Sequence, residues 1–410
     1  MPLGTRDDKS VPTIFSIYSL GIGTNRDSWA YNYSQHSLAS HMSSMIAAYN
    51  REVVRYARAC AGLSKDRWPK IEDFVDRDPR TISWSSSLLP NVVRGRKATF
   101  IRASIVQSVY RPFSKQWLYF DSMMNHRAGQ WPRIFPTPEH ENVVLAISGV
   151  GSRKPFSALA TKTLPDLELI EKGQCFPLYW YEKAKDAEAS DPRADMFSDE
   201  VTPDAHGYIR HEAITDAALA AFQDHYGDKI IGKEDLFWYV YGILHSPEYK
   251  EPFASDLKKM LPRIPYAGDF WTFSRAGREL GQWHLHYETV EPYPLTEDAS
   301  RPLTDADYRV TKMAFGKKDG KTDKSVIVYN AHLTLRGIPL EAYDYVVNGK
   351  SAIEWVMERY AVTVDKDSGI RNDANDWSED PRYIVDLVKR VVRVSVETVS
   401  IVQSLPRDCG

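Results

Sequence analysis

The chain of 410 residues contains little cysteine and no long apolar run. Its three cysteines, Cys60, Cys175 and Cys409, form no CxxC pair, which argues against a zinc site and a disulfide framework and favours a reducing cytoplasm. Because no apolar run reaches about 18 residues, we expect no membrane-spanning helix. The polar residues 1–12 also lack the apolar core of a signal peptide. We therefore expect a cytoplasmic protein.

Acidic residues are absent from one long stretch. Residues 79–120 contain no Asp or Glu, although the formal net charge of the whole chain is −3. The stretch carries seven basic residues: Arg80, Arg94, Arg96, Lys97, Arg102, Arg111 and Lys115. Aromatic residues lie between them, among them Trp84, Tyr110 and Trp117. Basic groups held among rigid aromatic neighbours favour phosphate binding, and a solvated basic face of a sheet is the alternative that composition leaves open.

Several enzyme motifs are also missing. The sequence has no GxSxG, no HExxH and no Asn/Asp-Pro-Pro-aromatic sequence of adenine methyltransferases. Gly320, Lys321 and Thr322 resemble the end of a P-loop, but Phe315 occupies the position of the earlier glycine that a P-loop needs. Pro-Asp at 165–166 and Asp-Leu-Lys at 256–258 resemble halves of a nuclease motif, but we expect the first in a turn and the second in an amphipathic helix. Thus no catalytic constellation is predicted.

Two other motifs have structural alternatives. Residues 147–152, Ile-Ser-Gly-Val-Gly-Ser, follow an apolar strand but lack a third glycine opening a helix, so a hairpin is favoured over a cofactor loop. A third alternative is a loop whose backbone, with Arg153 and Lys154, contacts phosphate. His284, His286 and Glu288 could bind a metal, but their helical pattern places neighbours two apart on different faces. We therefore expect no metal site.

The periodicity of the sequence predicts an α+β fold, sheet-rich in its N-terminal half and helix-rich in its C-terminal half. We predict strands at 14–20, 81–84, 97–109, 117–120, 143–147, 156–161, 174–178, 326–329 and 333–335. We predict helices at 28–60 with Asp27 as N-cap, 215–226, 233–245, 247–260, 274–287 with Ser274 as N-cap, 352–360 and 381–405. Residues 182–207 contain eight acids and three bases, a composition that predicts a linker or surface loop.

Several blocks, in order along the chain, resemble one family. They include TNRDSWAYNYS at 24–34, VYRPFSKQWLYFD at 109–121, IFPTPEHENVVLAISGVGSRKPFSAL at 134–159, FWYVYGILHSPEYKEPFASDLKKMLPRIP at 237–265 and ERYAVTVDKDSGIRNDANDW at 358–377. Together the blocks resemble the C-terminal specificity region of type ISP restriction-modification enzymes, across roughly residues 14–405. That family joins a nuclease, a helicase, an adenine methyltransferase and a target-recognition domain in one polypeptide.

The resemblance implies sequence-specific recognition of double-stranded DNA on behalf of helicase and methyltransferase modules upstream, in phage defence. Composition and patterning divide the chain into four expected parts: an N-terminal strand and long helix at 1–62, a basic, sheet-rich part at 63–181, an acidic linker or loop at 182–207 and a helix-rich part at 208–410. The resemblance makes the first the junction to the methyltransferase and the second the DNA-recognition part. S-adenosylmethionine, ATP and Mg²⁺ would belong to the other modules, so we expect no cofactor in this chain.

Within that framework the basic residues are our candidates for contacts with DNA. We expect these residues to be Arg94, Arg96, Lys97, Arg102, Tyr110, Arg111, Lys115, Gln116, Arg153 and Lys154. Arg111 and Gln116 carry paired donors suited to base edges. The alternative for Arg111 is a pair with Asp121 or with a buried carbonyl.

Two other functional classes stay open at this point. The chain could be a DNA-modifying enzyme, a nuclease or methyltransferase with a degenerate site, which a metal- or S-adenosylmethionine-dependent activity of the isolated chain would reveal. It could also be an interaction module that docks on a helicase without binding DNA. A gel shift with random duplex DNA separates that alternative from target recognition.

Overall fold

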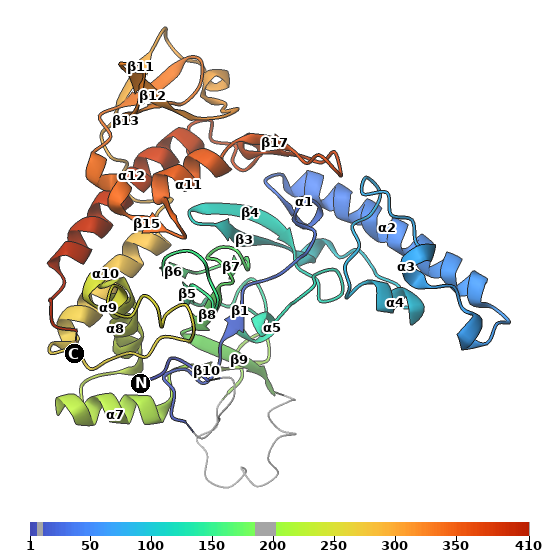
Figure 1. Ribbon diagram of the computed structural model, residues 1–410, viewed down its shortest axis with the longest axis horizontal. Helices are drawn as coiled ribbons and strands as arrows, with labels where there is room; N and C mark the ends of the chain where they lie inside the picture. The colour runs from blue at the N-terminus through green and yellow to red at the C-terminus, as the bar shows by residue number, and fades with distance from the viewer. Residues whose placement is uncertain (6–10, 185–201, 410) are drawn as a thin grey trace.

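The computed structural model describes residues 1–5, 11–184 and 202–409. Figure 1 shows a mixed α+β fold in which helices and strands occur throughout. The helices are α1 Asp27–Ala30, α2 Gln35–Cys60, α3 Ile71–Phe74, α4 Leu89–Val93, α5 Trp131–Ile134, α7 Asp216–Tyr226, α8 Lys233–His245, α9 Pro247–Lys250, α10 Phe270–Leu285, α11 Ala352–Arg359 and α12 Tyr383–Ser404.

The strands form small sheets rather than one large one. They are β1 Ser19–Leu20, β2 Tyr31–Asn32, β3 Ile105–Arg111, β4 Ser114–Tyr119, β5 Val144–Ile147, β6 Ala158–Thr161, β7 Leu164–Pro165, β8 Gln174–Pro177, β9 Tyr179–Lys183, β10 Tyr208–Glu212, β11 Thr296–Ala299, β12 Ala314–Lys318, β13 Lys321–Val328, β14 Leu333–Arg336, β15 Val346–Val347, β16 Lys350–Ser351, β17 Val362–Val364 and β18 Arg371–Asp373.

Two four-stranded sheets lie at the centre of the fold. One has the order β1-β8-β5-β6 with antiparallel neighbours, and the other has the order β2-β4-β3-β7 with a single parallel pair, β3 and β7. All four residues of β5 are buried, since Val144 and Ala146 join one hydrophobic cluster and Leu145 and Ile147 join another. A strand covered on both faces needs a continuous apolar run, which explains its sequence.

The helix-rich part packs against one face of the first sheet. Phe237 and Leu244 of α8 share a buried cluster with Leu145 of β5, Phe176 of β8 and Phe15. Gly277 of α10 lies so close to α8 that an added Cβ would stand 1.9 Å from the Trp238 carbonyl oxygen. This close approach requires glycine, and it holds α10 against α8.

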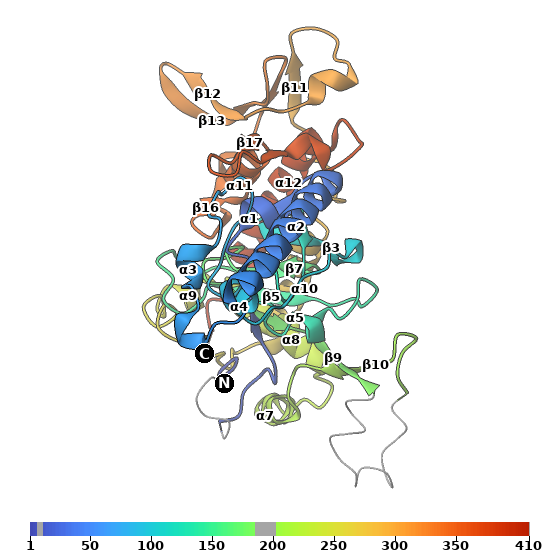
Figure 2. The ribbon, with the colours of Figure 1, turned by 90° about the vertical axis from the view of Figure 1, so that its right-hand side faces the viewer.

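Two parts extend away from this centre (Figures 1 and 2). The long helix α2 carries α3 and α4 beside it and has its own buried cluster, to which Met42, Tyr49 and Val53 contribute. The sheet β11-β14-β13-β12 stands at another extreme, at the top of both views and beyond α12. These two parts place exposed side chains far from the central core.

The first half of the chain differs from prediction at several strands. Only Ser19–Leu20 of the expected strand at 14–20 pairs within a sheet, and Phe15 makes an isolated bridge to Ile214. Residues 81–84 form no strand, because the amides of Thr81 and Ile82 turn back onto the Asp78 carbonyl. The strand expected at 97–109 begins only at Ile105.

Three predicted helices have different bounds. The helix expected at 28–60 is interrupted at β2, which pairs with β4, and α2 restarts at Gln35 with the Ser34 hydroxyl accepting from the Ser37 amide at 3.1 Å. The helix expected at 247–260 ends at Lys250 and continues as turns. Ser274 lies inside α10, whose N-cap is instead Asp269. By contrast, α7, α8, α11 and α12 lie within two residues of their expected bounds.

The acidic segment at 182–207 falls largely outside the described residues, which omit 185–201. Its described ends are joined, because β9 and β10 pair antiparallel from Tyr208 opposite Lys183 to Glu212 opposite Tyr179. The buried cluster of α8 also contains residues from both sides of the segment. Among the described residues, no helix is long and apolar enough to cross a membrane.

Candidate nucleic-acid interface

Four of the predicted basic residues lie on the segment that follows α4. Arg94 is the C-cap of α4, and Gly95 adopts a positive φ of 68° that turns the chain back along α2. The Tyr49 hydroxyl donates to the Arg96 carbonyl at 2.6 Å. The Asn50 amide accepts from the Ala98 N–H at 2.9 Å and donates to the Ala98 carbonyl at 2.8 Å. These bonds explain why 97–101 follows α2 instead of joining a sheet.

The side chains of this segment face solvent. Arg94, Arg96, Lys97 and Arg102 are all exposed, and none forms an ion pair among the described residues. The backbone beneath them is fixed by the bonds to α2, so their positions are set although their charged ends are free. A row of exposed cations on a rigid segment is suited to binding phosphates. We call these four residues the α4 basic segment.

Four other predicted residues lie inside the fold. The Arg111 side chain is only 15% exposed and donates to the Asp166 carboxylate at 2.7 Å, with Asp27 at 3.7 Å. Tyr110 donates to Asp27 at 3.1 Å. Burial raises the pKa of Asp166 to about 7, although the Arg111 guanidinium acts to lower it. Arg111 therefore pairs with two acids, Asp166 and Asp27. Asp121 is not its partner, and a carbonyl is not its sole partner.

Lys115 and Gln116 are also engaged within the chain. Lys115 forms an ion pair with Glu288, which follows α10, and the Gln116 side-chain carbonyl accepts from the Asn372 amide at 3.0 Å. The turn between β3 and β4 is buried too, since Phe113 is 1% exposed at a positive φ of 57°. A DNA contact by any of these side chains would have to replace a contact inside the fold, and that role stays a prediction.

The glycine-rich loop is organised around a buried carboxylate. Glu171 accepts from the Ser152 hydroxyl at 2.9 Å, from the Arg153 amide at 2.9 Å and from the Lys154 amide at 3.1 Å. Burial alone would raise the pKa of Glu171, but these hydrogen bonds lower it to about 2. The loop connects the antiparallel strands β5 and β6, so it is part of the hairpin favoured from the sequence, and its amides bind an internal carboxylate. This leaves those amides unavailable to a phosphate.

The side chains of that loop point outward. The Arg153 side chain is 92% exposed even though its Nε lies 3.2 Å from Glu171. The Lys154 ammonium lies 5.7 Å from the ring centre of Trp355 in α11, and a Cβ added to Gly349 would stand 3.3 Å from the Lys154 stem. Arg153 and Lys154 thus lie beside β16 and α11. The α4 basic segment lies elsewhere, along α2. The ten predicted residues do not form one cluster.

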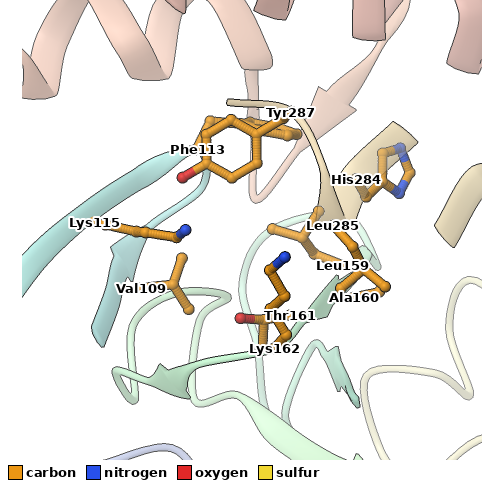
Figure 3. A pocket seen from close by; sticks show the side chains of 10 residues that line it. All are labelled: Val109, Phe113, Lys115, Leu159, Ala160, Thr161, Lys162, His284, Leu285 and Tyr287. Atoms are coloured by element: carbon orange, nitrogen blue, oxygen red, sulfur yellow. The ribbon is translucent and has the colours of Figure 1, made fainter. Parts of the chain in front are cut away.

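A small cavity lies where the two central sheets meet α10. Figure 3 shows Lys115, His284 and Tyr287 among its lining residues, together with Thr161 and Lys162. Its volume is about 20 Å³, which accommodates a water molecule but no nucleotide. His284 is buried beside it and bonds to Tyr241 and Thr398 rather than standing with His286. Among the described residues, no group of three or more His, Cys, Asp or Glu has a metal-binding arrangement.

Three solved structures resemble this fold closely. One is a nuclease-deletion mutant of the type ISP restriction-modification enzyme LlaGI in complex with a DNA substrate mimic, with a TM-score of 0.82 and 33% identity over 99% of this chain and 34% of that chain. The ATP-dependent type ISP enzyme LlaBIII bound to DNA matches with a TM-score of 0.82 and 29% identity, over 99% of this chain and 24% of that chain. A DrdV–DNA complex matches with a TM-score of 0.79 and 34% identity, over 96% and 36%.

The fold is therefore shared with a segment of type ISP restriction-modification enzymes. This chain spans 24–36% of the three matched chains. The model of the type ISP C-terminal specificity domain matches residues 13–387. The chain belongs to that family, which confirms the resemblance read from the sequence. No match was found among the curated proteins.

Proposed function

We propose that this chain binds double-stranded DNA and recognises the target sequence of a type ISP restriction-modification system. The observation that carries the proposal is the family match across residues 13–387, together with structural neighbours of 29–34% identity that were solved on DNA or on a DNA mimic. The exposed, unpaired cations of the α4 basic segment support it, because phosphate contacts need such groups on a fixed surface.

In this proposal the chain positions other modules and performs no chemistry itself. Upstream helicase and adenine methyltransferase modules of the same system are its partners. Those modules would bind ATP, Mg²⁺ and S-adenosylmethionine, while the residues described here hold the DNA. Phosphate contacts fix the register of a protein on the duplex, and contacts to base edges then select the sequence.

The α4 basic segment provides a direct test. Each phosphate contact adds about −0.9 to the slope of log affinity against log salt. We expect the R94A/R96A/K97A variant to flatten that slope by roughly two to three units, as measured by fluorescence anisotropy on duplex DNA. A matched R94K/R96K variant keeps the charge and is expected to retain the slope. An unchanged slope in the alanine variant would exclude this segment from the interface.

A further inference from the structure

The sheet β11-β14-β13-β12 projects a two-stranded hairpin from a rigid base. Ile327 and Tyr329 lie at its base with Leu333 and Leu335 of β14, and all four are at most 1% exposed. From this base β12 and the first half of β13 extend outward, and both views show them at the edge of the molecule (Figures 1 and 2). The hairpin is therefore an arm fixed at one end by a packed core.

The tip of the hairpin is a tight turn. Lys318 and Lys321 are paired residues of β12 and β13, and Asp319 and Gly320 connect them. Asp319 has φ 52° and Gly320 has φ 75°, the two positive values that the favoured two-residue hairpin turn requires. A tip with this geometry holds the side chains that flank it in defined positions.

Positive charge collects at this tip. Lys317, Lys318 and Lys321 are exposed, and none of them forms an ion pair among the described residues. Lys318 and Lys321 stand directly opposite each other, an arrangement of like charges that destabilises a hairpin. The nearby Asp323 carboxylate accepts from both the amide and the hydroxyl of Ser325.

At the base of the same sheet, by contrast, the basic side chains form ion pairs with acids. Lys324 lies 3.1 Å from Glu354, and Arg336 lies 2.8 Å from Asp298. The cations nearer the body of the molecule thus form ion pairs, whereas among the described residues the three tip lysines form none. The acids near them are Asp319 in the turn and Asp323, whose pKa the hydrogen bonds from Ser325 and the charge of Lys318 lower. Since opposed lysines weaken the free hairpin, their arrangement is explained best by an anionic partner that binds them.

We propose that the β12–β13 tip binds the phosphate backbone of a DNA duplex, as a contact separate from the α4 basic segment. This inference rests on the proposed function. Lysine is a compact point charge that suits phosphate rather than bidentate base recognition. A two-stranded ribbon is also narrow enough to follow a groove of the duplex. The tip therefore adds affinity that is independent of sequence.

The test compares the K317A/K318A/K321A variant with the wild type on two unrelated DNA duplexes over a range of salt. We expect the slope of log affinity against log salt to flatten by roughly two to three units, and affinity to fall by the same factor on both duplexes. A K317R/K318R/K321R variant keeps the charge and is expected to retain the wild-type slope. Loss on one duplex alone would make the tip a base-reading element and overturn the assignment to phosphate.

A second variant separates a local contact from the overall charge of the protein. K162A/K183A/K259A removes three exposed lysines on other parts of the chain, and we expect its salt slope to match that of the wild type. An unchanged slope in the tip variant, with intact binding by the wild type, would overturn this inference and leave the proposed function standing. Salt-independent or absent binding by the wild type would overturn both.

Discussion

Arg111 illustrates how a single residue can look like a recognition residue in the sequence and be an ion-pair partner in the fold. It lies in the acid-free stretch, where its neighbours suggest an exposed basic surface. Its acids are distant along the chain: Asp27 precedes it by 84 residues and Asp166 follows it by 55. Lys115 and Glu288 are 173 positions apart. Local sequence reveals the charge of such residues but cannot reveal partners brought together only by folding.

This placement makes a prediction about stability. Removing one partner of a buried ion pair leaves the other charge uncompensated, at a cost of about 3–5 kcal/mol. Since the raised pKa of Asp166 lets that acid become neutral, we expect Arg111→Met to lower the free energy of unfolding by about 3 kcal/mol in urea denaturation. Adding Asp166→Asn is expected to recover part of the loss. Unchanged stability with sequence-dependent loss of DNA binding would instead assign Arg111 to base recognition.

At the scale of elements, one buried imidazole links three helices to the first sheet. The Tyr241 hydroxyl of α8 accepts from the Ala160 amide of β6 at 2.9 Å and is hydrogen-bonded to Nδ1 of His284 of α10 at 2.6 Å. Nε2 of His284 is in turn hydrogen-bonded to the Thr398 hydroxyl of α12 at 2.9 Å. His245 lies beside this chain of bonds, with its ring centre 5.5 Å from that of His284. Both imidazoles are buried, and burial disfavours their charged forms.

Because His245 and His284 are buried, we expect the free energy of unfolding to fall in acid. Burial lowers the pKa of His245 to about 3 and that of His284 well below its usual range, whereas both titrate near 6.5 once unfolded. Below about pH 6.5 the unfolded state binds more protons, so the free energy of unfolding falls by about 1.4 kcal/mol per pH unit for each histidine. Urea unfolding between about pH 7 and pH 5 measures this loss.

A pair of variants assigns the pH dependence to its source. His284→Gln keeps a polar side chain in place and removes one titrating group, so we expect a shallower loss of stability with falling pH. His36→Gln changes an exposed histidine at the start of α2 and is expected to leave the dependence unchanged. An equal pH dependence in His284→Gln and the wild type would contradict the role given to this imidazole.

Elements with strong local signals were predictable, and elements made by distant partners were not. The helices α7 and α8 follow from periodicity, and α7 also has the N-cap Thr215, whose hydroxyl accepts from the Ala218 amide. The break between α1 and α2 depends on pairing with β4, which lies beyond the reach of periodicity. The hairpin β12–β13 carried a signal that sequence reasoning missed, because Asp319-Gly320 is a strong indicator of a two-residue turn.

At the scale of the whole molecule, segments far apart in the sequence share the same buried cluster, as Phe15 and Ile401 do. The fold class and the family were predictable, because they depend on many blocks spread along the sequence. Of the ten predicted contact residues, those of the α4 basic segment and Arg153 are exposed, whereas the fold engages Tyr110, Arg111, Lys115 and Gln116 inside; a DNA contact by any of the ten stays a prediction. The division at 182–207 rests on composition and stays a prediction.

Limited proteolysis tests that division. A segment rich in acids and poor in apolar periodicity is cut before packed elements, so we expect the first cleavage within 182–207. The two pieces should nevertheless stay together, because Phe15 and Phe176 on one side share a buried cluster with Phe237 and Ile401 on the other. Size-exclusion chromatography of the nicked protein should give one peak in buffer and two in denaturing urea. Two peaks in buffer would mean that the halves fold without a shared core, and a first cut within 215–286 would place the boundary elsewhere.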